Sequence, residues 1–228
     1  CLITFATLLL ATLLTGAPCA AAAELRLPAV FADHAVLQQN ARVPVWGWGE
    51  PGETITVAIA GQTATAIAGT DGRWQADLAP MTAGGPHELV VTAGSGSKTF
   101  SDILIGEVWL ASGQSNMQWS IKNTDGWEEE QARCANDKIR IAMVFRTCSP
   151  VPLNDLQGWT PWAPCNAESL ANCCNGEGFS GVSYYFAKHL QAGLGVPVGI
   201  INTSWGGTRI EPWTPPAGFE PIPSLAGI

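Results

Sequence analysis

The pattern of apolar residues changes near residue 103, and this change constrains the fold more than any other feature. Residues 24–102 hold short stretches of alternating apolar and polar residues, such as Thr54–Ile59, separated by Gly-rich turns. Ile103–Ala111 is instead almost continuously apolar. Alternating strands at roughly ten-residue spacing predict a β-sandwich. A continuous apolar run predicts a parallel strand covered on both faces. We therefore predict a β-sandwich accessory domain over residues 24–102 and a different unit over residues 103–228.

The second unit has the pattern of an α/β domain. Two further strands are predicted at Lys138–Phe145 and Val196–Asn202, and a helix at Ser180–Leu194 with one apolar face. Residues 146–178 are expected to be irregular. Strands that alternate with helices indicate a parallel sheet.

The first 23 residues carry no charge and contain the apolar run Leu2–Leu14, followed by the small residues Ala20–Ala23. This composition predicts a secretory signal peptide that is cleaved after Ala23, and hence a secreted or periplasmic protein. The alternative is an uncleaved membrane anchor, because the segment approaches the roughly 20 residues that span a bilayer. Only in that case do we expect contact with a membrane.

Export would make the remaining cysteines candidates for disulfides. They are Cys134, Cys148, Cys165, Cys173 and Cys174, an odd number that leaves at least one without a partner in this chain. The sequence has no C-x-x-C or H-x-x-x-H spacing, so we expect no metal site. No cofactor is indicated.

The formal net charge is −8 at pH 7. A nucleic-acid-binding protein needs a basic stripe for the phosphates, and none is found in the sequence. We therefore expect no nucleic-acid partner, whereas a neutral sugar ester remains compatible with this charge. The sequence does not indicate an oligomeric state.

Two loops follow the apolar strands and could carry chemistry, Gly113–Asn116 and Ser204–Thr208. In an open parallel sheet, reactive residues gather beyond the carboxyl ends of strands. Ser115 would begin a helix, where free N–H groups can stabilise an oxyanion. A simple N-cap role for Ser115 is the alternative, and Ser204 is the rival nucleophile. Neither serine lies in a G-x-S-x-G motif.

The segment Gly113–Met117, preceded by Gly106–Leu110, resembles the first block of the SGNH hydrolase superfamily. More narrowly, it resembles bacterial sialate O-acetylesterases and related carbohydrate acetylesterases. The resemblance extends over nearly all of residues 25–215 and includes residues 30–38, 43–48, 179–186, 199–208 and 210–213. It implies an N-terminal β-sandwich followed by a flavodoxin-like, three-layer α/β/α esterase domain, of which residues 103–228 would be the first part.

The same resemblance implies roles for individual residues. Ser115 would be the nucleophile that attacks an acetyl ester, and its backbone N–H and that of Gly181 would form part of the oxyanion hole. Residues of the two loops would contact the substrate: Gln114, Asn116, Trp205, Gly206, Gly207 and Thr208. The implied partner is an acetylated sugar, either a sialic acid or another glycan.

The chain departs from the family pattern in two respects, because it lacks both the general base and the third block that supplies another oxyanion donor. The family's general base is a His in an Asp-x-x-His block, and no such block occurs in these 228 residues. His34, His87 and His189 are not expected to replace it. A serine without a base is a poor nucleophile, so the chain is expected to be an inactive front part of an esterase. The alternatives are a non-catalytic carbohydrate-binding protein that uses exposed Trp side chains, or a pseudoenzyme.

Overall fold

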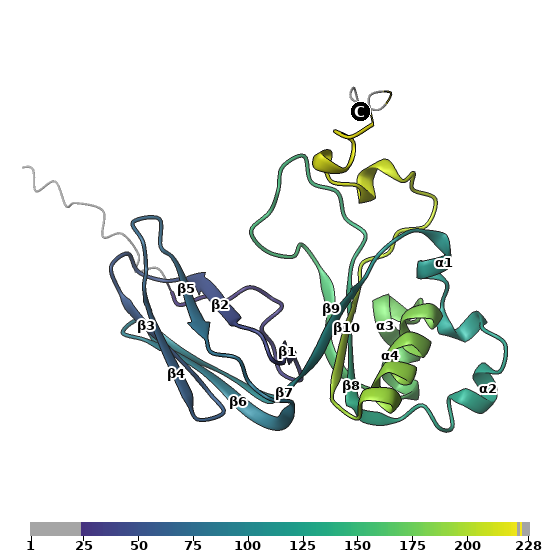
Figure 1. The fold of residues 1–228 in the computed structure, drawn as a ribbon, viewed down its shortest axis with the longest axis horizontal. Coiled ribbons are helices and arrows are strands. Elements are labelled where there is room, and N and C mark those ends of the chain that lie inside the picture. The colour runs from purple at the N-terminus through teal and green to yellow at the C-terminus, as the bar shows by residue number, and fades with distance from the viewer. Residues whose placement is uncertain (1–23, 223, 225–228) are drawn as a thin grey trace, which may run out of the picture.

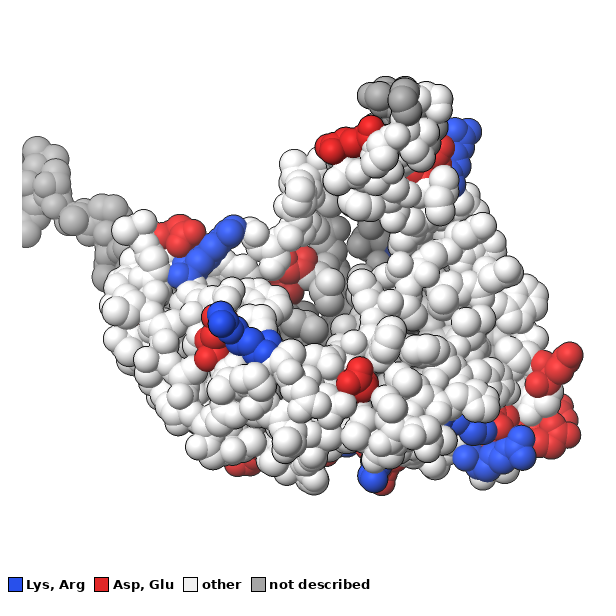
Figure 2. All heavy atoms as spheres, in the orientation of Figure 1, with Lys and Arg blue, Asp and Glu red and all other residues white. Residues whose placement is uncertain are grey.

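The computed structural model describes residues 24–222 and residue 224. This part of the chain is a mixed α/β structure that consists mostly of sheet (Figure 1). The predicted signal peptide, residues 1–23, lies outside the described residues. Among the residues described, no helix is long and apolar enough to cross a membrane. On the face shown in Figure 2, Lys and Arg are scattered among Asp and Glu rather than gathered in a stripe.

Ten strands and seven short or long helices are assigned in the described residues. The strands are β1 (Val36–Gln38), β2 (Val43–Trp48), β3 (Thr54–Ile59), β4 (Gln62–Ile67), β5 (Arg73–Leu78), β6 (Gly84–Ala93), β7 (Gly96–Ala111), β8 (Asn136–Val144), β9 (Trp159–Cys165) and β10 (Val198–Asn202). The helices are α1 (Ser115–Gln118), α2 (Trp127–Glu130), α3 (Ala167–Gly176) and α4 (Gly181–Leu194), with 3₁₀ turns η1 (Ile121–Asn123), η2 (Glu211–Trp213) and η3 (Pro216–Gly218).

The N-terminal strands form two layers around one core. The antiparallel ribbon β2–β5 faces a sheet in which the strands run in the order β4-β3-β6-β7. The predicted alternation is observed, because Ile55, Val57 and Ile59 of β3 point into this core while the residues between them do not. The period of two in the sequence therefore fixes which side of each strand is buried.

Strand β7 runs across the predicted boundary between residues 102 and 103. Its first part pairs antiparallel with β6, and its last five residues pair parallel with β10. Asp102 has a positive φ of 54°, which bends the strand between the two parts. One strand thus belongs to both halves of the molecule (Figure 1). The division into separate domains at this point stays a prediction.

The predicted parallel sheet is present, with β10 between β7 and β8. The predicted helix is α4, which ends at Gly195 in the left-handed conformation. Helices α3 and α4 cover one face of this sheet. On the other face, Ala142 and Trp162 join the N-terminal core. The expected three-layer α/β/α arrangement is therefore not seen in residues 24–222, where helices cover one face of the sheet and residues of the other face pack into the N-terminal core.

The expectation that residues 146–178 are irregular is wrong for part of that segment. It contains helix α3 and strand β9, and β9 pairs antiparallel with β8 as the edge strand of the sheet. Pro161 and Pro164 obscured the strand, but an edge strand tolerates proline because half of its N–H groups need no partner. Helix α3 begins with a capping box between Asn166 and Ser169. Its backbone leaves helical geometry over residues 173–175.

Candidate active site

Ser115 lies directly beyond the carboxyl end of β7 and begins the short helix α1. It is exposed and lines a cavity of about 510 Å³. Gly206 and Gly207, beyond the end of β10, line the same cavity. The two loops that the sequence singled out therefore meet at one site, as expected for neighbouring parallel strands.

Backbone hydrogen bonds hold the two loops together. Thr203 N–H donates to the carbonyl of Ala111 at 2.9 Å, and Trp205 N–H donates to the carbonyl of Gly113 at 2.9 Å. Gly113 has φ of +137°, which strongly favours glycine. These contacts extend the β7–β10 pairing past the strand ends and fix the position of Ser115 relative to Gly206.

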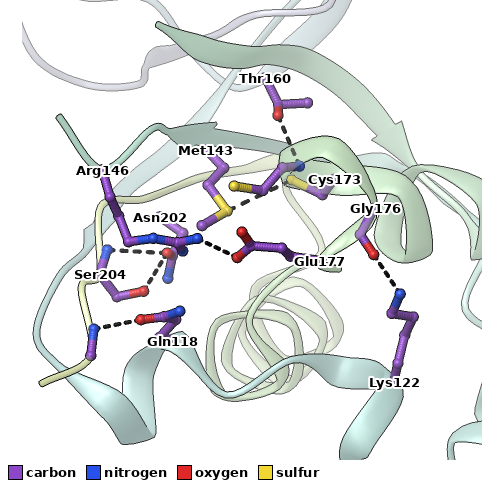
Figure 3. Close-up of polar contacts among 12 residues, drawn as sticks. Gln118, Lys122, Met143, Arg146, Thr160, Cys173, Gly176, Glu177, Asn202 and Ser204 are labelled. Carbon is purple, nitrogen blue, oxygen red and sulfur yellow. Dashed lines mark hydrogen bonds and ion pairs between the residues drawn. The ribbon is translucent and has the colours of Figure 1, made fainter.

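Ser204, the rival nucleophile, is fully buried. Its Oγ donates to Asn202 Oδ1 at 2.6 Å, and its N–H contacts the same oxygen at 3.2 Å (Figure 3). Asn202 Nδ2 in turn donates to Ser183 Oγ at 3.0 Å. This buried chain of hydrogen bonds links β10 to α4. Ser204 is thus part of the scaffold beneath the cavity and does not face it.

Gly206 is packed closely between the two loops. Its N–H donates to Oε1 of Gln118, a residue that the sequence analysis did not consider. A Cβ atom at Gly206 would lie 2.8 Å from that oxygen and 3.4 Å from the Cα of Ser115. Glycine at this position therefore permits the close approach of the two loops. Gly207 adopts a positive φ of 78° on the open side of the cavity.

The oxyanion role expected for Gly181 does not agree with the structure. Gly181 is buried at the start of α4, and its N–H donates to the carbonyl of Trp119 at 2.9 Å. A donor that is already satisfied in the scaffold is not free to bind an oxyanion. The N–H of Ser115 makes only a 3.3 Å contact with the side chain of its neighbour Gln114, so it is the better candidate.

The remaining predicted substrate residues lie around the cavity without lining it. Gln114 caps α1, and Asn116 is exposed in the first turn of that helix. Thr208 Oγ1 donates to the Trp205 carbonyl at 2.7 Å and accepts a hydrogen bond from Trp213 Nε1 at 2.7 Å. These residues therefore shape the two loops in this structure.

A third strand end, which was not predicted to carry functional residues, also contributes to the cavity. Met143 of β8 and Arg146 just beyond it line the wall, together with Glu177 at the end of α3. Arg146 Nη2 donates to the carboxylate of Glu177 (Figure 3). The rule about strand ends applies to this predicted strand as well, and it would have drawn attention to Arg146.

No histidine lines the cavity within the described part of the chain. His34 Nδ1 lies 2.7 Å from Oδ2 of Asp102, which is in β7. His189 is exposed on α4, eight residues beyond the start of that helix. At 1.5 Å per residue it is about 12 Å along the axis from the helix end nearest Ser115.

The described residues contain no group of three or more side chains suited to a metal ion. The five cysteines in this region are unpaired thiols, of which Cys148 is exposed and the other four are buried. Burial raises the pKa of Cys165 to about 12 and that of Cys173 to about 11. These two buried thiols are therefore protonated at neutral pH and are poor nucleophiles.

Comparison with known proteins agrees with the resemblance found in the sequence. The family model of the carbohydrate esterases described as sialic acid-specific acetylesterases matches residues 105–221. The sialate O-acetylesterase of Pongo abelii is 31% identical over 221 residues, covering 86% of this chain and 41% of that protein. The mouse sialate O-acetylesterase is 33% identical over 202 residues, covering 83% of this chain and 37% of that protein.

A solved structure shows the same fold. A carbohydrate acetylesterase from Xanthomonas citri matches with a TM-score of 0.78 and 37% identity, over 85% of this chain and 43% of that one. The chain thus spans about two fifths of the length of the relatives it matches. The match of the family model across both loops and the cavity shows that the chain belongs to the sialic acid-specific acetylesterase family of carbohydrate esterases.

Proposed function

We propose that the chain carries the nucleophile and part of the substrate cavity of a serine esterase that removes O-acetyl groups from a sialic acid or another acetylated glycan. The observation that carries this proposal is the exposed Ser115 in the cavity at the carboxyl ends of β7, β8 and β10. Membership of an acetylesterase family supports the reaction class. Fold alone would not, because one fold hosts many activities.

The proposed reaction has two steps. Ser115 Oγ attacks the acetyl carbonyl carbon and its proton passes to a general base; the bond from that carbon to the sugar oxygen then breaks as the oxygen takes the proton and leaves as a hydroxyl. Water then attacks the acetyl-serine ester and releases acetate and the free Ser115 hydroxyl. The N–H of Ser115 would donate to the oxyanion in both steps.

The base is the missing component. The family resemblance places it in an Asp-x-x-His block, which does not occur in these 228 residues. We therefore propose that the active enzyme contains such a block outside this sequence. We further propose that residues 24–102 act as an accessory β-sandwich and that the protein is secreted or periplasmic. A non-catalytic carbohydrate-binding protein is the second candidate, and Trp46, which is 37% exposed, supports it.

The test uses the complete gene product that contains this chain. Ser115→Ala is expected to abolish release of acetate from 9-O-acetyl-N-acetylneuraminic acid, because loss of an activated nucleophile costs several orders of magnitude in rate. Ser97→Ala, which removes an exposed serine hydroxyl at the start of β7 and away from the cavity, is the matched control and should retain most activity. Full activity of the Ser115→Ala protein would overturn the proposal and would favour the binding function.

A further inference from the structure

Arg146 is the cation in the wall of the cavity that holds Ser115. Among the described residues that line this cavity, Arg146 and Glu177 are the two that carry charge. The guanidinium donates from Nη2 to the carboxylate of Glu177, and 19% of the Arg146 side chain is exposed (Figure 3). The Glu177 contact therefore holds the guanidinium in the cavity wall, where Arg146 is the one positively charged residue among the described lining residues.

The pairing leaves part of the guanidinium unused. Arg146 Nη1 is buried and has no hydrogen-bond partner. A buried donor without a partner costs about 1–3 kcal/mol, and more for a charged group. Arginine offers five N–H donors in a planar fork, and a carboxylate matches that fork in shape and charge. The unused donor at a cavity wall thus indicates a ligand that carries an anionic oxygen.

We propose that Arg146 binds the carboxylate of an acidic sugar while the O-acetyl group of the same sugar lies at Ser115. Because Nη1 is buried, the proposed contact requires the guanidinium to rotate about its contact with Glu177 when the ligand binds. Glu177 is a positioning residue, because it holds Nη2 and leaves the other edge of the fork for the ligand. The proposal rests on the proposed function for the position of the acetyl group, but the carboxylate contact can be tested without catalysis.

A purely structural role for the ion pair makes different predictions. Arg146 follows β8 and Glu177 ends α3, so their contact also ties these two elements together. If the ion pair had only this structural role, loss of Arg146 would lower the melting temperature and weaken the binding of all ligands equally. A carboxylate-binding role requires instead that acidic and neutral forms of one sugar are affected differently.

The experiment measures binding of N-acetylneuraminic acid and of its uncharged C1 methyl ester to this chain by isothermal titration calorimetry. The acid is expected to bind about tenfold or more tightly than the ester, since a hydrogen bond to a charged group contributes about 1.5–3 kcal/mol. Arg146→Gln should remove this preference and leave the affinity for the ester unchanged. Arg146→Lys should keep part of it, because an ammonium retains the charge without the fork.

Two controls separate this role from others. Glu177→Gln keeps an acceptor for Nη2 and should preserve the preference for the acid, whereas Arg73→Gln removes a cation far from the cavity and should change nothing. Equal affinity of the wild-type chain for acid and ester, or no binding of the acid, would overturn the proposal whether or not the variants fold. If the complete protein does not release acetate while this chain still binds the acid more tightly than the ester, only the proposed function is contradicted.

Discussion

Ser115 Oγ donates a 2.7 Å hydrogen bond to Oε1 of the adjacent Gln114. An amide oxygen accepts a hydrogen bond but does not take the proton at neutral pH, so this contact orients the hydroxyl without activating it. The exposed serine is therefore positioned by its own helix cap. Among the described residues that line the cavity there is no histidine, and the one carboxylate, that of Glu177, is paired with Arg146.

From this contact we predict that the 228-residue chain hydrolyses p-nitrophenyl acetate no faster than its Ser115→Ala variant. The measurement is the initial rate of p-nitrophenolate release at equal protein concentration, corrected for the buffer rate. Turnover by the wild-type chain well above that of Ser115→Ala would show that a base is present after all. His189→Ala would then be the next variant to measure.

Replacing Ser204 and replacing Ser115 should have different effects on stability. Ser204→Ala removes the 2.6 Å hydrogen bond to the buried Asn202 Oδ1, which keeps the contact from the backbone N–H of residue 204, and should lower the free energy of unfolding by about 0.5–1.5 kcal/mol. Ser115→Ala removes an exposed hydroxyl and should change it by less than about 0.5 kcal/mol. Urea unfolding followed by near-UV circular dichroism compares the two variants. The reverse order of effects would mean that the scaffold role assigned to Ser204 is wrong.

Much of the fold could be predicted because apolar patterning is strong where the sheet is buried. The runs at Ile103–Ala111 and Val196–Asn202 mark β7 and β10, and the apolar face of residues 180–194 marks α4. Strand β9 was missed because an edge position lets two prolines interrupt its pattern. The left-handed bend at Asp102, which lets one strand serve both halves, has no local sequence signal of that kind.

The site could be predicted only in part. Ser115, Gly206 and Gly207 follow strands whose ends the sequence marks, and all three line one cavity. Gly181 was assigned by resemblance, and its N–H is used within the scaffold instead. Glu177 reaches the cavity from the far end of α3, a helix that was not expected. Contacts that depend on such an element cannot be read from strand patterning.

The buried carboxylate of Glu130 should make stability depend on pH. Burial by itself would raise its pKa, but hydrogen bonds from Lys188, Tyr184 and Arg133 outweigh burial and lower the pKa from 4.5 to about 2. A lowered pKa in the folded state contributes stability that is present above the unfolded value and lost as pH falls.

We therefore predict that the free energy of unfolding falls between about pH 4.5 and pH 2 by up to the order of 3 kcal/mol from this group. Glu130→Gln should be less stable at pH 7 and should show a flatter profile in this range. Urea unfolding at a series of pH values gives both curves. Parallel wild-type and variant profiles would show that Glu130 does not carry this dependence.

The position of β7 predicts where the N-terminal half can be separated. Ile103 and Ile105 are each 1% exposed in the N-terminal core, and β1 pairs with residues 104–106 of β7. A fragment that ends at residue 102 loses both isoleucines and this pairing. Full burial of one such side chain contributes about 1.5–3 kcal/mol. The N-terminal core therefore extends four residues beyond the predicted boundary at residue 102.

We predict that a fragment of residues 24–106 melts cooperatively and at a higher temperature than a fragment of residues 24–102. Both lack Ala142 and Trp162, which also contact this core, so the comparison isolates the four added residues. Ile103→Ala in the longer fragment should remove much of the gain, because it leaves a cavity where a buried side chain stood. Differential scanning calorimetry of the three proteins provides the test. Equal melting temperatures for the two fragments would show that the core is complete before residue 103 and that β7 contributes to it only by pairing with β6.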